Sequence, residues 1–444
     1  MQSGGLARRA ASGAAVVVGA YGVSSAIRLT SNLILTRLVA PEAFSLMAIA
    51  LTIYIWVGLI SDVGLNTSIV RSDNGDDPRF ISTAFVMQIV RGVALGAVIG
   101  AVALFFLLGG GDLFPPNLVY ADDNLGPILL FVSLVATIDG FTSMKVSLAQ
   151  RRLEMARLAP LELSTQFIGA CSTLVFAYFG FGVYALVYGM VIGGVAKMIA
   201  SHAFLPGPDL SLDFDRAHFR EIFSFGKWIV LSSTFGFLAQ RGDQLIFSGI
   251  MDKTEFSFYA IAGIWIMAAR QVFGTLISRV AFPAIAEIGR DRPLDRSRAY
   301  YRLRLAFDFS IAAFVVATLA LADIAFGVMY TEQYAAVAGY VKLLVVGVLL
   351  TPYNILNSVV LAEGRSREFT LVTFCQGATP LIGGPLLFHW IGLEAAILFV
   401  ALSPLAVLPL MWFLAGKNMV IDMRREAPLA VFAVALAVAL AAFA

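Results

Sequence analysis

Apolar runs of about 20 residues recur along the whole chain, with only short polar stretches between them. A run of that length is what an α-helix needs to cross the hydrocarbon core of a bilayer. The composition agrees, because 59% of the 444 residues are hydrophobic and only 14% are charged, and a water-soluble globule needs more polar surface than that. The sequence therefore predicts an all-α, polytopic transmembrane helical bundle with no room for a sizeable soluble domain.

A sliding window of about 19 residues places the predicted spans. Twelve of them lie at 14–38, 43–66, 80–108, 125–148, 158–179, 182–204, 223–250, 256–286, 302–329, 335–362, 369–390 and 393–416. A last apolar run at 428–444 is barely long enough to cross the membrane. The chain is thus expected to have about 12 to 13 spans.

Lysine and arginine collect in every second connection, which is the pattern of cytoplasmic loops. One set of connections carries Arg71, Arg151, Arg296 and Arg367 among others. The longest connection of the other set, 109–124, has neither lysine nor arginine. This alternation predicts that the N-terminus lies in the cytoplasm.

An internal repeat predicts two lobes. Segment 31–50 aligns without gaps with 243–262, with identical residues at seven positions, and 148–152 matches 361–365 in a register that differs by one residue. Since six spans return the chain to its starting side, the two halves should be related by a pseudo-two-fold axis along the membrane normal.

The expected domain organisation follows from the spans and the repeat. It comprises an N-terminal six-helix lobe at 1–204, a cytoplasmic amphipathic linker at 205–222, a C-terminal six-helix lobe at 223–416, and a cytoplasmic loop with an extra hydrophobic helix at 417–444. The linker alternates Phe, Leu and Ile with charges, which is typical of an interfacial helix.

Several segments resemble a known family. They are the first span with its buried arginine running into NLILTRLVAPEAFS at 32–45, the DVGL end of the second span at 62–65, and RGDQLI at 241–246. Together they resemble the Wzx-type oligosaccharide flippases of the polysaccharide transporter family, members of the MATE-like multidrug/oligosaccharidyl-lipid/polysaccharide superfamily. The resemblance covers nearly the whole chain in layout.

This resemblance implies a two-lobed, MATE-like bundle with a central cavity that works by alternating access. The implied substrate is an undecaprenyl-pyrophosphate-linked oligosaccharide, moved from the cytoplasmic to the periplasmic leaflet of the bacterial inner membrane. The implied pathway is surface polysaccharide biosynthesis, of O-antigen, capsule or exopolysaccharide. The implied partners are membrane lipids and a polysaccharide polymerase with its chain-length machinery.

Ionisable groups far from the span ends are the candidate site residues, because each costs about 2.5–3.5 kcal/mol at a helix centre. They are Arg28, Arg91, Arg241, Arg270, Asp139 and Asp243. Pairing of arginine with aspartate would explain some of them, but four arginines against two aspartates leave surplus positive charge. A cavity that receives an anion explains the surplus, since the guanidinium fork binds phosphate oxygens.

The candidates have distinct expected roles. Arg28 and Arg241 lie one position out of register in the repeat, so we expect them to face one cleft from opposite lobes and to hold a pyrophosphate. Asp139 and Asp243 are the candidates for ion coupling or charge balance, with Asp139 favoured for proton or sodium coupling, although a carboxylate near arginine can simply be a salt-bridge partner. Two glutamines could contact sugar or bridge helices, and both interpretations stay open; these are Gln88 and Gln166.

Other functions are disfavoured by what the sequence contains. No phosphate-binding loop of the G-x-x-x-x-G-K-[ST] type occurs, so ATP hydrolysis is not expected. The lack of room for a soluble domain disfavours catalysis outside the membrane, so the chain is not expected to be an enzyme. Cys171 and Cys375 lie in apolar runs and are interpreted as packing residues, with no metal or cofactor expected. The net charge of +2 does not favour nucleic-acid binding.

Three alternatives remain open. A MATE-type antiporter for cationic drugs should carry a carboxylate-rich cavity, and a lipid II flippase would differ mainly in the headgroup that it accepts. A membrane polysaccharide polymerase or glycosyltransferase is less favoured, because it should carry a large periplasmic loop or a soluble domain.

Overall fold

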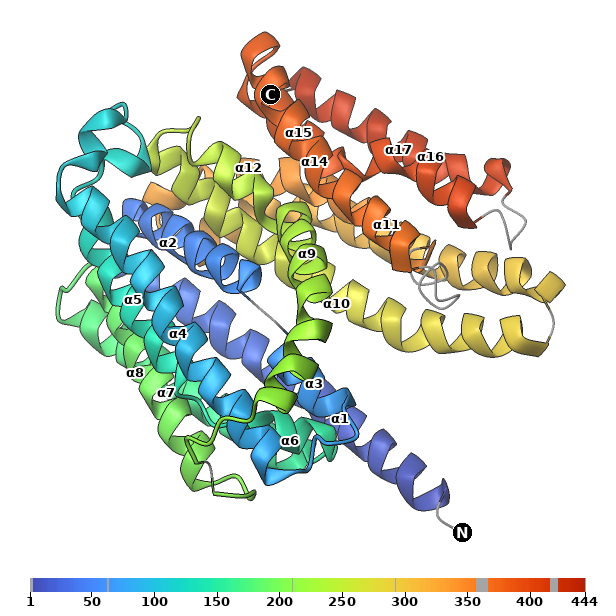
Figure 1. Ribbon diagram of the computed structural model, residues 1–444. Coiled ribbons are helices and arrows are strands. Elements are labelled where there is room, and N and C mark those ends of the chain that lie inside the picture. The colour runs from blue at the N-terminus through green and yellow to red at the C-terminus, as the bar shows by residue number, and fades with distance from the viewer. Residues whose placement is uncertain are drawn as a thin grey trace. The chain divides into compact units, whose positions relative to one another are not determined.

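The computed structural model describes residues 3–61, 64–209, 211–291, 293–356, 366–415 and 422–443. Throughout these ranges the regular secondary structure is helical (Figure 1). Contacts divide the chain into two units. Unit 1 comprises Met1–Thr234 and Met251–Thr254, and unit 2 comprises Phe235–Ile250 and Glu255–Ala444.

Unit 1 consists of long helices joined by short turns. Its elements are α1 (Ser3–Leu35), α2 (Pro41–Ile60), α3 (Leu65–Arg71), α4 (Pro78–Leu107), η1 (Gly110–Leu113), η2 (Val119–Ala121), α5 (Leu125–Gly140), α6 (Lys145–Arg151), α7 (Met155–Tyr178), α8 (Tyr184–Ala203) and the first part of α9 (Arg216–Phe247). The sequence determines where several of these helices begin. Proline occupies the first turn of α2 and α4, where its missing N–H costs nothing, and the Asp77 side chain accepts a hydrogen bond from the Arg79 N–H at 2.9 Å.

Small residues let the helices of unit 1 approach closely. A Cβ at Gly92 on α4 would lie 2.4 Å from the Cα of Gly140 on α5, so any side chain would force these helices apart. The pair α7 and α8 has the same kind of contact, where a Cβ at Gly193 would lie 3.2 Å from the Cα of Gly169. Glycine at helix contacts is typical of membrane bundles.

Unit 2 continues with α9 and contains the longest helices. The further elements are α10 (Lys253–Asp291), α11 (Pro293–Met329), η3 (Glu332–Tyr334), α12 (Val337–Val345), η4 (Val346–Tyr353), α14 (Ser366–Trp390), α15 (Leu393–Leu402), α16 (Pro404–Ala415) and α17 (Met423–Phe443). All residues of η4 are buried, and this segment packs against α11, α15 and α17. The core of unit 2 therefore forms around η4.

The predicted fold class is confirmed as a polytopic helical membrane bundle. Over the described residues, each predicted span coincides with a helix or with consecutive helical segments; residues 62–63, 357–362, 416 and 444 of the predicted spans and 417–421 of the predicted loop lie outside the described residues. Within the described ranges, eight helices are long and apolar enough to cross a membrane, and a ninth span results if α5 and α6, which are bent by 59°, count as one. The higher count of 12 to 13 includes more polar helices such as α7, and the pseudo-two-fold relation stays a prediction.

The predicted linker at 205–222 differs from the structure in one respect. Residues 205–209 and 211–215 are not helical, and α9 runs without interruption from Arg216 to Phe247. The first turns of α9 are anchored, because Ile222 is fully buried in a cluster with Leu65 and Phe80. Residues 216–222 of the predicted linker therefore form the start of a long helix, and the interfacial position of this segment stays a prediction.

Candidate functional site

A polar cluster joins α2, α4 and α5 inside unit 1. The hydroxyl of Tyr54 on α2 donates a hydrogen bond to Oδ2 of Asp139 near the end of α5. Arg91 on α4 donates to the backbone oxygen of Gly58 at 2.8 Å and to Oγ of Ser61 at 3.0 Å, at the end of α2. Asp139 and Arg91 are both half-buried. These hydrogen bonds therefore offset the energetic cost of placing ionisable groups within the spans.

The two glutamines bridge helices. Nε2 of Gln88 donates to the backbone oxygens of Asp139 at 3.2 Å and Thr142 at 2.7 Å, which tie α4 to the end of α5. Nε2 of Gln166 on α7 donates to the backbone oxygen of Ser24 on α1 at 2.9 Å, and its Oε1 accepts from the Ser24 hydroxyl at 2.6 Å. Of the two interpretations left open, these contacts favour the bridging one. Sugar contact stays a prediction.

A second polar cluster joins α9 and α10 inside unit 2. The hydroxyl of Tyr259 on α10 donates to Oδ2 of Asp243 on α9, and both Arg241 and Arg270 interact electrostatically with this carboxylate. Arg241 also places Nη2 3.2 Å from Sδ of Met267. Each unit thus contains a tyrosine–aspartate pair with arginine nearby.

Arg270 lies against the buried segment η4. A Cβ at Gly347 would lie 2.5 Å from Nη2 of Arg270 and 2.5 Å from the backbone oxygen of Ala401. Glycine is therefore required there, since any side chain would displace the guanidinium. Arg270 nonetheless keeps an exposed surface.

Arg28 is also exposed, on α1 of unit 1. Nη2 of Arg28 donates a long hydrogen bond of 3.4 Å to Oγ of Ser25, one turn earlier on the same helix. The structure thus brings Arg241, Asp243 and Arg270 together in unit 2. The expected juxtaposition of Arg28 with Arg241 stays a prediction.

The tyrosine partners were missed by reasoning from the sequence. Tyr54 and Tyr259 lie in apolar runs, where a tyrosine is normally interpreted as a packing residue. The signal that could have found them is the aspartate itself, because a carboxylate within a span requires a donor.

These clusters lie in a multi-pass membrane protein whose fold is shared with solved transporters. The structure matches lipid II flippase MurJ in an inward closed conformation with a TM-score of 0.67 at 10% identity, over 96% of this chain and 91% of that one. It matches an inward-facing multidrug resistance MATE family transporter of the MOP superfamily with a TM-score of 0.60 at 14% identity, over 92% of this chain and 94% of that one. These likenesses establish the fold.

The sequence assigns the family. Residues 34–339 match the model described as polysaccharide biosynthesis protein, and the chain belongs to this family. It is 23% identical over 304 residues to the succinoglycan biosynthesis transport protein ExoT of Rhizobium meliloti (strain 1021), covering 68% of this chain and 58% of that protein. It is 23% identical over 366 residues to the lipopolysaccharide biosynthesis protein WzxC of Escherichia coli (strain K12), covering 80% of this chain and 71% of that protein.

A third relative also takes part in polysaccharide biosynthesis, according to its name. The amylovoran biosynthesis protein AmsL of Erwinia amylovora is 21% identical over 293 residues, covering 64% of this chain and 72% of that protein. The succinoglycan protein is considerably longer than its matched part, since this chain spans 58% of its length.

Proposed function

We propose that this protein is a flippase for lipid-linked oligosaccharides in surface polysaccharide biosynthesis. It moves an undecaprenyl-pyrophosphate-linked sugar unit from the cytoplasmic to the periplasmic leaflet of the bacterial inner membrane by alternating access, with its N-terminus in the cytoplasm. It acts as a transporter and not as an enzyme. The names of three relatives, which concern succinoglycan, lipopolysaccharide and amylovoran, support the substrate class.

The observation that carries the proposal is the exposure of arginines within the helical bundle. Arg28 is exposed on α1, and Arg270 on α10 keeps an exposed surface although its guanidinium lies against the buried segment η4. A charged side chain facing hydrocarbon is costly, so such residues face a water-filled space or a polar ligand. Because the guanidinium presents paired N–H donors, an anionic pyrophosphate is the ligand that best fits these residues.

The remaining candidate residues take supporting roles in the proposal. Arg241 acts with Arg270 beside Asp243, and Arg91 contributes positive charge in unit 1 while fixing the end of α2. Asp139 is the proposed site of coupling to a proton or sodium ion. The proposed partners are the lipid-linked oligosaccharide, membrane lipids, and a polymerase with its chain-length machinery.

Glycan export in cells that lack their own flippase tests the proposal. We expect the wild-type protein to restore surface polysaccharide, and Arg28→Ala and Arg270→Ala to lose it while remaining inserted. Arg37→Ala is the matched control, because Arg37 is exposed just beyond the end of α1 and should not matter. Normal export by both cavity variants would contradict the anion-binding role.

Two further assays separate the related functions. Export of a cationic dye without restoration of glycan would assign the chain to drug transport. Rescue of cells depleted of their lipid II flippase, again without glycan export, would assign it to lipid II.

A further inference from the structure

A buried ion pair lies at the centre of a network in unit 2. Arg304 on α11 pairs with Glu426 on α17, and their side chains are 1% and 0% accessible. Nη1 of Arg304 donates to the Tyr300 hydroxyl at 2.7 Å, which donates to Oε1 of Glu426 at 3.0 Å. Nε1 of Trp412 donates to Oε2 of Glu426 at 3.0 Å, and the Tyr353 ring lies 4.0 Å from Cζ of Arg304. The network holds α11 and α17 together.

Among the described residues, two atoms at the edge of this network have no hydrogen-bond partner. Nε of Arg304 lies 3.3 Å from Oδ2 of Asp308, but Nη2 of Arg304 and Oδ1 of Asp308 have no hydrogen-bond partner among the described residues. Both atoms are buried, and a buried unpartnered donor or acceptor costs about 1–3 kcal/mol. One is a cationic donor and the other an anionic acceptor, so a ligand that satisfies both must carry an acceptor and a donor.

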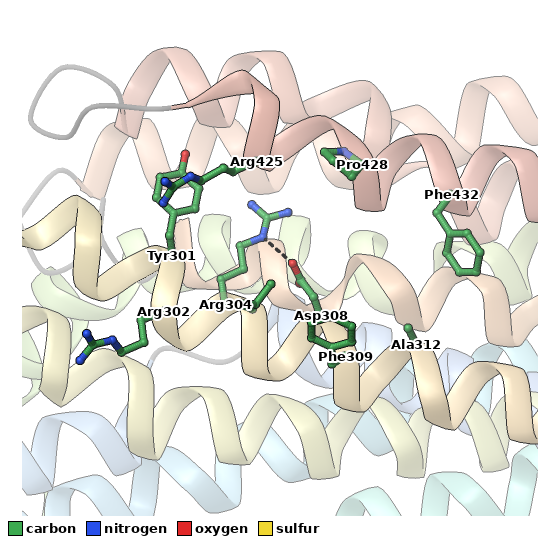
Figure 2. Close-up of a pocket in the computed structure, with 10 residues that line it drawn as sticks. Tyr301, Arg302, Arg304, Asp308, Phe309, Ala312, Arg425, Pro428 and Phe432 are labelled. Atoms are coloured by element: carbon green, nitrogen blue, oxygen red, sulfur yellow. Dashed lines mark hydrogen bonds and ion pairs between the residues drawn. The ribbon is translucent and has the colours of Figure 1, made fainter.

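A groove between α11 and α17 offers the space for such a ligand. Its volume is about 700 Å³, in the range of small-molecule sites. Arg304 and Asp308 line its polar end, and Phe309, Ala312 and Phe432 line its apolar part (Figure 2). Residues 304 and 312 are about 12 Å apart along α11, at 1.5 Å per residue. The groove is therefore polar at one end and apolar at the other, like a lipid.

The depth and charge of the groove indicate which lipid fits. The apolar span of α11 begins at Tyr300, so the polar end lies at the start of the span and the apolar part lies farther along it. The positive and negative charges around the polar end are equal in number. Arg304 forms ion pairs with Glu426 and Asp308, and Nε of Arg425 lies 3.2 Å from Oδ2 of Asp422. Arg302 also lines the groove, so three arginines stand against three carboxylates around the polar end. A balanced site favours a zwitterionic headgroup over a net anionic one.

We propose that this groove binds a phosphatidylethanolamine-type lipid. A phosphate oxygen accepts from Nη2 of Arg304, the headgroup ammonium donates to Oδ1 of Asp308, and one acyl chain lies along Phe309, Ala312 and Phe432. The proposal goes beyond the transported substrate, because the lipid is a bound component of the bundle.

Native mass spectrometry of the purified full-length protein tests the proposal. The protein is delipidated and offered phosphatidylethanolamine, phosphatidylcholine or phosphatidylglycerol with identical acyl chains. The choline headgroup has no N–H to donate to Asp308, and the phosphatidylglycerol headgroup has no cationic group. We expect phosphatidylethanolamine to be retained about tenfold better than either, as loss of a charged hydrogen bond predicts.

Two variants locate the site. Asp308→Asn should abolish the preference for ethanolamine over choline, and Ala312→Trp should fill the groove and abolish retention of every lipid. Ala313→Trp is the matched control, because Ala313 is exposed and does not line the groove. Thermal unfolding of each variant verifies that it is folded.

Three results would overturn the proposal. They are equal retention of phosphatidylethanolamine and phosphatidylcholine by the wild-type protein, unchanged retention by Ala312→Trp, and co-purification of a polyprenyl pyrophosphate in the groove in place of the phospholipid. Because the readout is lipid retention, it is independent of glycan export and so of the proposed transport function.

Discussion

Tyr54 donates a hydrogen bond to Asp139 across 85 residues of sequence, and so links α2 to α5. The aspartate is half-buried near the end of an apolar helix, and a carboxylate within a span needs a hydrogen-bond donor. We expect Tyr54→Phe to lower the free energy of unfolding by about 1–3 kcal/mol, the cost of an unsatisfied buried acceptor. Thermal unfolding in detergent measures this. Tyr178→Phe, at a residue 77% exposed, is the control and should leave stability unchanged.

The Asp139→Asn variant distinguishes a role of Asp139 in ion coupling from a purely structural role. Asparagine keeps the shape of the side chain and still accepts from Tyr54, but it cannot exchange a proton or hold sodium with a full charge. We expect export of the glycan to be lost while the melting temperature stays close to that of the wild type. Normal export by this variant would assign Asp139 a structural role only.

Arg241 allows binding to be distinguished from charge balance. Lysine at this position keeps the charge and loses the planar fork, so Arg241→Lys should export partially and Arg241→Ala not at all. If Arg241 only balances Asp243, then Arg241→Ala combined with Asp243→Ala should restore export, because no uncompensated charge remains. Glycan export is measured for each, together with Arg241→Ala combined with Asp139→Ala. We expect no rescue by either double variant.

Gly347→Ala displaces Arg270 without touching its charge. The added methyl would lie 2.5 Å from Nη2 of Arg270 and 2.5 Å from the backbone oxygen of Ala401, so the guanidinium and the contact between η4 and α15 must both shift. Misplacement of a positioning group by about 1 Å can cost about a hundredfold in rate, so we expect a large loss of export with normal insertion. Gly339→Ala is the matched control, since nothing lies within 4 Å of its Cβ. Equal export by the two variants would show that the position of Arg270 is unimportant.

The helices could be predicted because their signal is local. A run of about 20 apolar residues has few alternatives to a membrane helix, and positions of spans such as 80–108 and 182–204 agree with α4 and α8 to within a few residues. The start of α9 was missed because an amphipathic segment such as 216–223 has the same pattern whether it lies at an interface or packs on a protein.

The side-chain partners could not be predicted, because they are set by packing. Arg304 lies at the start of the predicted span 302–329, and it pairs with Glu426 at a separation of 122 residues. Nothing in either local sequence indicates the other. The same holds for Asp139 and Tyr54, whereas Asp243 and Tyr259 are separated by 16 residues on consecutive helices.

Cysteine labelling tests the predicted topology. Cysteines placed at Asp112 and Asn117 should react from outside with a membrane-impermeant maleimide in intact cells, and cysteines at Arg152 and Arg296 should react only after permeabilisation. Cys171 and Cys375, which are free and half-buried, are first replaced by serine. Labelling of Arg296→Cys from outside would contradict the cytoplasmic N-terminus.

The pair of Arg304 and Glu426 should respond to single and double substitution in opposite ways. Arg304→Met leaves the fully buried Glu426 without its cation, and breaking a buried pair costs about 3–5 kcal/mol. Arg304→Met combined with Glu426→Met removes both charges and their desolvation cost, so most of the lost stability should return. Thermal unfolding of the wild type and of both single and double variants measures this. The surface pair of Arg157 and Glu154, with side chains 59% and 30% accessible, is the control and should contribute less than about 1 kcal/mol. If the double variant is no more stable than Arg304→Met alone, the hydrogen bonds from Tyr300 and Trp412 to the carboxylate, and not the ion pair, hold α11 and α17 together.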